Sequence, residues 1–392
     1  MSRYHAYLST ATKLIKTYKA GSPLVHHLKA HFSANKKMGS KDRKIVAALC
    51  YHYFRCKSLF KNDEEVSQVV VKSAFICDSQ GLKSLLADLS PELHSQSELS
   101  LDQRLAHLNL DKKNLFALEQ ELSDYIDSNL FAQSFLQQSF LFLRIRPGKE
   151  KIVLSAVEKN SINFQRVNEQ CVQLPVGVDV SSFLTINKDA VIQDLNSQQV
   201  MDGLLQFLNN TTEKSKWSVW DTCAASGGKS ILIYDLLKGK VKLTVSDIRK
   251  NILNNLDARL SAAGINIYNK FTADLSVHSG LDTEDKFDIV ICDAPCTGSG
   301  TWARTPEQQY AVTAEDIEAF ASRQLGILNN ILPHVSPGGL LVYITCSVFV
   351  KENEAVVEAF LKQNKSIKVI QHNYYKGYEL GADTLFSAVI SC

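Results

Sequence analysis

The hydrophobic positions of the chain follow a helical period up to about residue 130. In the stretch KDRKIVAALCYHYFR, the spacing predicts an amphipathic helix with a buried stripe of Ile45, Ala48, Leu49, His52 and Tyr53. The stretch DKKNLFALEQELSDYIDSNL predicts another helix, with a stripe of Leu115, Leu118, Leu122 and Ile126. We therefore expect residues 1–130 to form an all-helical domain.

Between residues 131 and 198 the pattern changes to short strands around a helix. SFLFLRIRPG alternates like a strand, EKIVLSAVEKNS has a helical period, and INFQRV, CVQLPV and AVIQDL resemble further strands. A weak helical stretch lies near Val180–Leu184. This order predicts a small ferredoxin-like, or RRM-like, α+β domain built as βαββαβ.

From about residue 199, strands and helices alternate regularly. The predicted strands are WSVWD, KLTVSD, NKFTAD, FDIVICDAP, GGLLVYITCS, IKVIQ and LFSAVIS. Helices are expected through Ile252, Leu256 and Leu260, and behind Thr313 as an N-cap. SPGG at 336–339 is expected to break the chain before the next strand. The alternation predicts a mostly parallel α/β sheet, which binds ligands at the carboxyl ends of its strands.

Composition narrows the class of protein. A chain of 392 residues is long enough for two or three domains, and it contains no apolar run of the roughly 20 residues that a membrane span needs. Its start lacks the apolar stretch of a secretory signal. Nine cysteines without a CxxC pair favour reduced thiols in a cytoplasmic protein. Cys292 and Cys296 have no second ligand pair, so we expect no metal site.

Charge is distributed unevenly within the helical region. Residues 1–61 carry thirteen Lys or Arg and one acid, a net charge of +12, whereas residues 62–130 carry five basic and thirteen acidic residues, a net charge of −8. Such a run can be a solvated face. A dense basic block also gains affinity for phosphates by releasing counterions, which favours contact with nucleic acid.

The turn DTCAASGGKS, at 221–230, ends like a P-loop. A P-loop needs glycine, four spacers and then Gly-Lys-Ser/Thr, because its backbone N–H groups curl round a phosphate. The first glycine of that pattern falls on Cys223. We therefore expect a ligand with less negative charge than a nucleoside triphosphate.

Three successive strands are expected to end in an acid, namely Asp221, Asp247 and Asp274. One such acid is commonly a turn former or a helix cap. Three on one ligand edge favour a nucleoside without phosphates, with Asp247 accepting from ribose hydroxyls and Asp274 from an adenine amino group. S-adenosylmethionine (AdoMet) fits, because its sulfonium charge suits an acidic pocket.

Two cysteines are expected at adjacent strand ends. Cys296 lies in DAPCTGSG at 293–300, and Cys346 lies in TCS at 345–347. A single buried cysteine is commonly a small hydrophobic residue. Two at the same catalytic edge, one of them beside Asp293, favour chemistry.

These motifs carry a family resemblance. DTCAASGGKS, SDIRKNILNNLDARLSAAGI, FDIVICDAPCTGSGTWARTPE and LVYITCSVFVKENEAVVEAFL resemble the ordered motifs of the RsmB/Sun family of RNA (cytosine-5)-methyltransferases, over roughly residues 190–392. VIQDLNSQQV resembles the segment before the catalytic domain, and GSKDRKIVAALCYHYFR resembles the NusB-like domain of bacterial members. Ser226 replaces the usual proline of the glycine turn, and Asp383-Thr384-Leu385-Phe386 replaces a common Asp-Gly-Phe-Phe.

The resemblance implies a Rossmann-like class I methyltransferase domain over residues 199–392 that binds AdoMet. It implies that Cys346 is the nucleophile that adds to cytosine, that Cys296 promotes product release, and that Asp293 and Lys229 assist catalysis. The expected cofactor-binding residues are Asp221, Cys223, Ala224, Ala225, Ser226, Gly227, Gly228, Lys229, Asp247, Arg249, Asp274, Asp293 and Pro295.

The function expected from the resemblance is formation of 5-methylcytosine in RNA, with ribosomal RNA as the substrate. Transfer RNA is an alternative substrate, and a non-catalytic RNA-binding assembly factor that retains the AdoMet fold is an alternative function. We expect a cytoplasmic monomer with no membrane contact.

Overall fold

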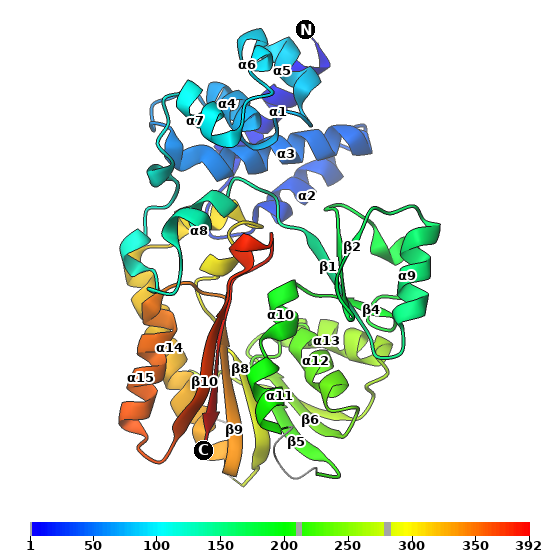
Figure 1. Ribbon diagram of the computed structural model, residues 1–392, viewed down its shortest axis with the longest axis vertical. Coiled ribbons are helices and arrows are strands. Elements are labelled where there is room, and N and C mark those ends of the chain that lie inside the picture. Colours follow the sequence, from blue (N-terminus) through cyan, green and yellow to red (C-terminus); the bar gives the residue numbers. More distant parts are fainter. Residues whose placement is uncertain (1, 209–213, 278–283) are drawn as a thin grey trace. The chain divides into compact units, whose positions relative to one another are not determined.

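The computed structural model describes residues 2–208, 214–277 and 284–392, and the chain forms two compact units. Unit 1 comprises Met1–Leu122, Ile126–Gln138 and Thr301–Thr313. Unit 2 comprises Ser123–Tyr125, Ser139–Gly300 and Ala314–Cys392. Figure 1 shows the helices of unit 1 and the sheets of unit 2. The division into domains at 1–130, 131–198 and 199–392, and the NusB-like nature of the first, stay predictions.

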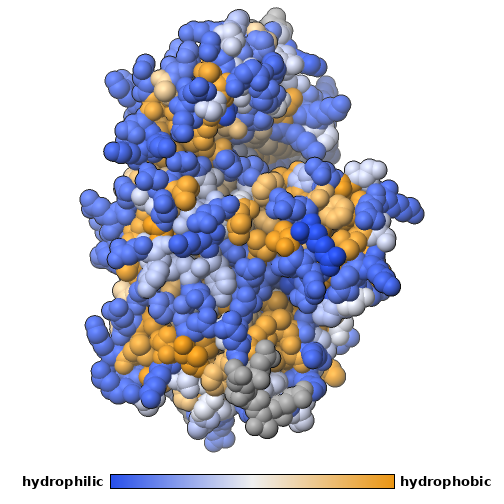
Figure 2. All heavy atoms as spheres, viewed as in Figure 1, coloured by the Kyte–Doolittle hydropathy of each residue, from blue (hydrophilic) through white to orange (hydrophobic). Residues whose placement is uncertain are grey.

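Unit 1 is helical, as the period predicts. Its helices are α1 (Arg3–Thr17), α2 (Leu24–Ala34), α3 (Ser40–Cys56), α4 (Val66–Asp78), α5 (Lys83–Leu89), α6 (Pro91–Ser95), α7 (Leu101–His107) and α8 (Ser128–Ser134). Short 3₁₀ turns are η1 (Lys57–Leu59), η2 (Lys112–Leu115), η3 (Glu119–Glu121) and η6 (Pro306–Ala311). Apolar side chains of α1 to α4 form one core. On the face drawn in Figure 2, hydrophilic residues cover most of this unit.

The predicted stripe of α3 is only partly the most buried one. Leu49 is buried together with Val46, Cys50, Phe54 and Cys56, whereas Ile45 and Tyr53 are half-buried and also pack against the core of unit 1. The period was right, but apolar residues occupy more than half of the circumference of this helix. Packing of α3 against α1 and α4 selects which part of that surface is buried.

The helix predicted through Leu115 and Ile126 is also wrong. The segment holds only the turns η2 and η3, and α8 begins at Ser128. Tertiary contacts replace helical hydrogen bonds here. Phe116 packs edge-on against Phe131 and Phe135, and the Ser123 N–H donates to the Val348 carbonyl at 3.0 Å.

Unit 2 begins with a four-stranded antiparallel sheet. Its elements are β1 (Leu141–Ile145), α9 (Glu150–Lys159), β2 (Gln165–Asn168), β3 (Cys171–Leu174), η4 (Val180–Ser182) and β4 (Ala190–Ile192). The strand order is β2-β3-β1-β4, which is ferredoxin-like, with η4 in place of the second helix. Arg144 and Arg146 bind Asp235 at 2.6 and 2.8 Å, so buried ion pairs join this sheet to helix α12 (Gly228–Leu236).

The larger sheet of unit 2 has the predicted seven strands. They are β5 (Trp217–Asp221), β6 (Val241–Asp247), β7 (Tyr268–Thr272), β8 (Phe287–Asp293), β9 (Val335–Thr345), β10 (Lys368–Tyr375) and β11 (Leu385–Ser391). Their order is β10-β11-β9-β8-β5-β6-β7. Strands β5 to β9 pair in parallel, and β11 runs antiparallel to both of its neighbours. This arrangement is Rossmann-like and confirms the predicted fold class.

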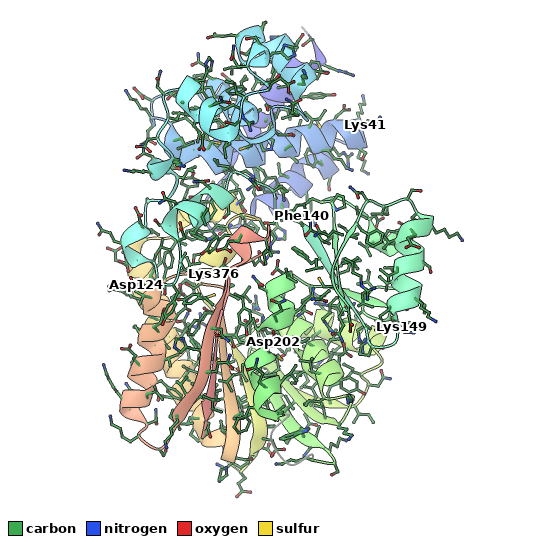
Figure 3. The ribbon with its side chains drawn as sticks, viewed as in Figure 1. Lys41, Asp124, Phe140, Lys149, Asp202 and Lys376 are labelled. Atoms are coloured by element: carbon green, nitrogen blue, oxygen red, sulfur yellow. The ribbon has the colours of Figure 1, made fainter. Side chains whose placement is uncertain are left out.

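Helices cover both faces of the larger sheet. Helices α12 (Gly228–Leu236) and α13 (Lys250–Ala262) pack with α10 (Leu195–Gln199) and α11 (Asp202–Leu208) on one side (Figure 1). Helices α14 (Ala314–Ile331) and α15 (Glu354–Gln363) cover the other. The remaining 3₁₀ turns are η5 (Ser299–Thr301), η7 (Leu332–His334), η8 (Val350–Glu352) and η9 (Gly377–Glu379). In Figure 3, Asp202 marks the start of α11.

The predicted chain break at SPGG before the next strand is wrong, because these residues lie within one strand. Residues 336–339 belong to β9, whose pairing with β8 jumps from Val335 to Leu340. Gly338, at φ +73°, adopts a left-handed conformation that glycine tolerates readily. Its N–H donates to the Cys392 carbonyl at 2.7 Å, so an irregular stretch still finds a hydrogen-bonding partner.

The described residues form no helix with the length and apolar character to cross a bilayer. They also contain no group of three or more His, Cys, Asp or Glu side chains placed to hold a metal ion.

Candidate active site

A pocket of about 440 Å³ lies beyond the carboxyl ends of the parallel strands in unit 2. This is the edge at which open α/β sheets bind ligands, and the volume is within the usual range for small-molecule sites. Its lining residues are Thr222, Cys223, Ala225, Asp247, Ile248, Arg249, Ala273, Asp274, Leu275, Asp293, Ala294, Pro295, Cys296, Arg323, Ile327 and Cys346.

The glycine turn connects β5 to α12 at the base of this pocket. Ala225 has φ +46° and Gly227 has φ +84°, so the turn is tightly wound before the helix begins at Gly228. A side chain at Gly227 would begin 3.2 Å from Leu256 Cγ, and it would also be strained by the positive φ. The predicted residues Ala224, Ser226, Gly227, Gly228 and Lys229 shape or flank the turn but are not among the pocket-lining residues.

Ser226, which replaces the usual proline, has a partner outside the pocket. Its hydroxyl accepts a hydrogen bond from the Arg259 guanidinium of α13 at 2.6 Å. The turn is also held from β6, because the Ala225 N–H donates to Asp247 Oδ2 at 3.0 Å.

Asp247 lies at the end of β6 on the pocket wall. Its Oδ1 accepts from the Arg249 N–H at 2.9 Å and from Arg249 Nε at 3.0 Å. Burial alone would raise the pKa of Asp247, but the hydrogen bonds and charge of Arg249 outweigh that effect and lower it. Asp247 is therefore a charged acceptor. Because the Arg249 side chain is 57% exposed, it can leave this carboxylate when a hydroxylated ligand binds.

Asp247→Ala is expected to weaken AdoMet binding by about 1–3 kcal/mol, the usual effect of leaving buried hydroxyls without a partner. Isothermal titration calorimetry with AdoMet measures this change. Affinity for RNA should change little, and the conservative variant Asp247→Asn should retain part of the binding. Unchanged AdoMet affinity in Asp247→Ala would remove this residue from the site.

Asp221 lies beneath the pocket rather than in its wall. The residue is buried, Oδ2 accepts from the Ser230 hydroxyl at 2.6 Å, and Oδ1 has no hydrogen-bond partner. Burial raises the pKa of Asp221 to about 7, in spite of the hydrogen bond from Ser230. Asp221 is not among the residues that line the pocket, and its hydrogen bond with Ser230 supports the first turn of α12. Its contact with a cofactor stays a prediction.

The raised pKa of Asp221 makes stability depend on pH. The folded state holds this proton more tightly than the unfolded state, so the stabilisation is fully present below about pH 4 and is lost as pH rises through about 7. Between pH 5.5 and 8 the free energy of unfolding should fall by about 2 kcal/mol more in the wild type than in Asp221→Asn. Urea denaturation over this range tests the difference. Parallel pH profiles in the two proteins would contradict it.

The far end of the pocket combines an acid with apolar side chains. Asp274, just after β7, accepts from the Ser276 N–H at 3.0 Å and from the Ser276 hydroxyl at 2.6 Å, and these hydrogen bonds lower the pKa of Asp274.

Some residues that line the pocket were not predicted from the sequence, among them Ile248, Leu275, Arg323 and Ile327. Arg323 and Ile327 are four residues apart on α14, a spacing that places them on one face but does not reveal which face meets the pocket.

Lys229 and Asp293 form a partly buried ion pair at the pocket. Lys229 Nζ donates to Asp293 Oδ2 at 2.6 Å, from the first turn of α12 to the end of β8. Burial lowers the pKa of Lys229, but the charge and hydrogen bond of Asp293 outweigh burial and raise it above its ordinary value. The lysine is therefore charged, and its charge also acts on Cys346.

The two predicted thiols meet at the pocket wall. Cys296 Sγ and Cys346 Sγ are 3.3 Å apart, and both residues line the pocket with Asp293. The hydrogen bond with Cys346, together with burial, raises the pKa of Cys296 well above its ordinary value. Cys296 is therefore favoured in its protonated form.

A Rossmann-like sheet with an acid-lined pocket beyond its parallel strands is a setting in which α/β domains bind nucleoside ligands. Residues 206–387 match the family model described as 16S rRNA methyltransferase RsmB/F. The match covers less than half of the chain, so the similarity to this family concerns that segment.

Two curated relatives are similar to part of the chain. The probable ribosomal RNA small subunit methyltransferase B of Bacillus subtilis is 33% identical over 196 residues, which are 50% of this chain and 42% of that protein. The protein of the same description from Coxiella burnetii is 27% identical over 262 residues, 66% of this chain and 59% of that protein. The chain thus spans about half the length of these relatives.

Solved structures share the fold. The crystal structure of PH0851 aligns over 98% of both chains with a TM-score of 0.72 and 17% identity. The structure of NSun6 from Pyrococcus horikoshii with SFG covers 71% of this chain and 96% of that one, with a TM-score of 0.58 and 17% identity. At these identities the likeness concerns the fold alone.

Proposed function

We propose that the protein is an AdoMet-dependent RNA methyltransferase that forms 5-methylcytosine, with ribosomal RNA as its substrate. The observation that carries this proposal is the pair of thiols 3.3 Å apart at the ends of β8 and β9, beside the Lys229–Asp293 pair. The family match and the names of the two relatives support a ribosomal RNA substrate.

The pocket fits AdoMet by the chemistry of its lining. Asp247, Asp274 and Asp293 supply acceptors for a cationic ligand with ribose hydroxyls and an amino group. Ile248, Leu275 and other apolar lining residues suit the faces of a purine ring. When bound, AdoMet would supply an electrophilic methyl group. Asp247 would hold the ribose of AdoMet, and the glycine turn would leave space for the remainder of the AdoMet molecule.

Cys346 would provide the nucleophile. Its sulfur would add to carbon 6 of cytosine, and the ring electrons that move as this bond forms would make carbon 5 nucleophilic. An ordinary thiol is only a few per cent thiolate at neutral pH, so the site must supply a base or a positive charge for this step. Asp293 would hydrogen-bond the ring nitrogen and amino edge, stabilising charge as it develops.

Cys296 would act after carbon 5 has been methylated. The proton on carbon 5 must then pass to a base, and the electrons of that C–H bond restore the ring as the bond between carbon 6 and Cys346 breaks, with the Cys346 sulfur as the leaving group. The 3.3 Å between Cys296 and Cys346 supports a role for Cys296 in this release. The target cytosine must be unpaired or flipped out of a helix, because the attack approaches the face of the base.

A methyl-transfer assay tests the function. Purified protein is incubated with tritiated AdoMet and either small-subunit ribosomal RNA or bulk transfer RNA, and bisulfite sequencing then maps the product. Methylcytosine in ribosomal RNA is the expected result. Product confined to transfer RNA would support the alternative substrate, while no transfer to either RNA would favour a non-catalytic assembly factor. A cytoplasmic location and a monomeric state are part of the same proposal.

The exposed lysines of unit 1 should contribute to RNA affinity. Lys41 extends from the first turn of α3 (Figure 3), and other exposed lysines belong to the same basic block. Six of the exposed lysines are Lys13, Lys29, Lys36, Lys37, Lys41 and Lys44. Changing all six to Gln should flatten the plot of log affinity against log salt by roughly 0.7–0.9 per lost phosphate contact. Filter binding at several salt concentrations measures the slope, with Lys151→Gln/Lys159→Gln as control. An unchanged slope would make the block a solvated face.

A further inference from the structure

Glu352, in η8, is a fully buried carboxylate with neutral hydrogen-bond partners. Oε1 accepts from the Thr297 N–H at 2.9 Å and from Gln324 Nε2 at 3.0 Å. Oε2 accepts from the Thr297 hydroxyl at 2.6 Å and from the Ser347 hydroxyl at 2.5 Å. Burying a carboxylate is unfavourable unless hydrogen bonds compensate for the lost water, so four converging donors indicate a built feature.

The partners of Glu352 flank the two thiols. Thr297 directly follows Cys296 in the loop after β8, and Ser347 directly follows Cys346 in the loop after β9. A single carboxylate therefore holds both loops, and Oε2 bonds to both at once. The loops belong to different strands, so their local sequences do not fix the distance between their sulfur atoms.

Asn353 completes the arrangement around Cys346. Its Nδ2 donates to the Ser347 carbonyl at 2.9 Å, and its Oδ1 accepts from the Thr345 hydroxyl at 2.5 Å. Both chain neighbours of Cys346 are thus held by one buried amide. The hydrogen bonds of Asn353 thus hold the Cys346 loop, and those of Glu352 join this loop to the Cys296 loop.

We propose that Glu352 is a positioning residue that holds the nucleophilic and product-releasing thiols at their working separation, with Asn353 fixing the Cys346 loop. The inference rests on the proposed function for the roles of the two thiols. Its reason is geometric, because a misplacement of about 1 Å at a reacting group can lower a rate on the order of 100-fold. A buried group that ties both loops limits such misplacement.

The first test measures the thiol pair without using methyl transfer. The protein is equilibrated with oxidised and reduced glutathione, and the fraction of molecules in which a disulfide joins Cys296 and Cys346 is measured. This fraction gives the effective concentration of the Cys296 thiol at Cys346. Glu352→Ala should lower this effective concentration at least tenfold, and Glu352→Gln, which keeps the shape and some acceptors, should lower it less. The matched control is Glu354→Gln, since Glu354 bonds instead to Ser123 and Tyr374.

The second test measures the reaction. Single-turnover methylation should slow about 10- to 100-fold in Glu352→Ala, and Glu352→Gln should recover part of the rate. AdoMet affinity should stay within twofold of the wild type, because Glu352 does not line the pocket. Glu354→Gln should behave like the wild type in both tests.

The outcomes separate this inference from the proposed function. Wild-type effective concentration and rate in both Glu352 variants would overturn the positioning role. If the wild type itself fails to methylate RNA, the proposed function fails, and the glutathione measurement still decides whether Glu352 sets the thiol separation. If Glu352→Ala does not fold, the Gln variant decides: an effective concentration equal to that of the wild type overturns the inference, and a reduced one supports it.

Discussion

Cys346→Ala is expected to abolish methyl transfer and to leave no covalent complex with RNA, because no other group would form the bond to carbon 6. Cys296→Ser is expected to behave differently. Addition and methyl transfer do not use the sulfur of Cys296, so only release should stall. That variant should accumulate enzyme bonded through Cys346 to methylated RNA, visible on denaturing gels as a shifted band that ribonuclease removes.

The double variant Cys296→Ser/Cys346→Ala is the control for this band and should not form it. Trapping by Cys346→Ser and none by Cys296→Ser would mean that the two roles are exchanged. Methylation without an adduct in any variant would contradict thiol addition and would direct attention to an exocyclic nitrogen as acceptor. Because the two sulfur atoms are 3.3 Å apart, either thiol can reach a cytosine bound at the same position.

Gly300→Ala should severely damage the fold around the thiols. A Cβ at this position would lie 1.9 Å from the Thr384 carbonyl oxygen and 3.1 Å from that of Cys346. The backbone there is held on both sides, since the Gly300 N–H donates to the Cys346 carbonyl and the Thr384 N–H donates to the Gly300 carbonyl, each at 2.9 Å. Relief would require moving the strand-end loop that carries Cys346. We expect destabilisation of about 3 kcal/mol or more, together with loss of methylation.

Urea denaturation of Gly300→Ala measures this effect, and Gly326→Ala is the matched control. Gly326 is inside α14, where the nearest atom to an added Cβ is 3.9 Å away. A helical glycine replaced by alanine usually gains roughly 0.5–1 kcal/mol, so the control should be neutral or more stable. Equal stability of the two variants would contradict the close approach of Gly300 and Thr384.

Thr384 also clarifies one departure from the family pattern. The segment Asp383-Thr384-Leu385-Phe386 has its first two residues at the loop that receives Gly300, and Asp383 accepts through its carbonyl from Asn196 at 2.7 Å. Both hydrogen bonds use backbone atoms of Asp383 and Thr384. A different side chain in this segment therefore leaves them in place.

Periodic patterns in the sequence were sufficient to predict the seven strands of the larger sheet and the sheet edge at which the pocket lies. Apolar runs predicted strand ends at Asp221 and Asp247, where β5 and β6 do end, whereas β7 ends at Thr272, two residues before the predicted Asp274. Parallel strands bring such ends to one edge. The juxtaposition of Cys296 and Cys346 was predictable for the same reason. These features depend on local sequence and on the chirality of strand connections, which leave few alternatives.

Contacts between distant segments determined the rest. They selected the buried side of α3, which its period left open, and placed Asp221 beneath the pocket although its strand-end position resembled that of Asp247. They also placed the carboxylate of Glu352 between two loops that are 50 residues apart in the chain. Local sequence encodes period and strand ends, because each depends on neighbouring residues. Which face is buried, and which polar groups meet, depends on the free energy of packing whole elements together, and only the tertiary structure contains that information.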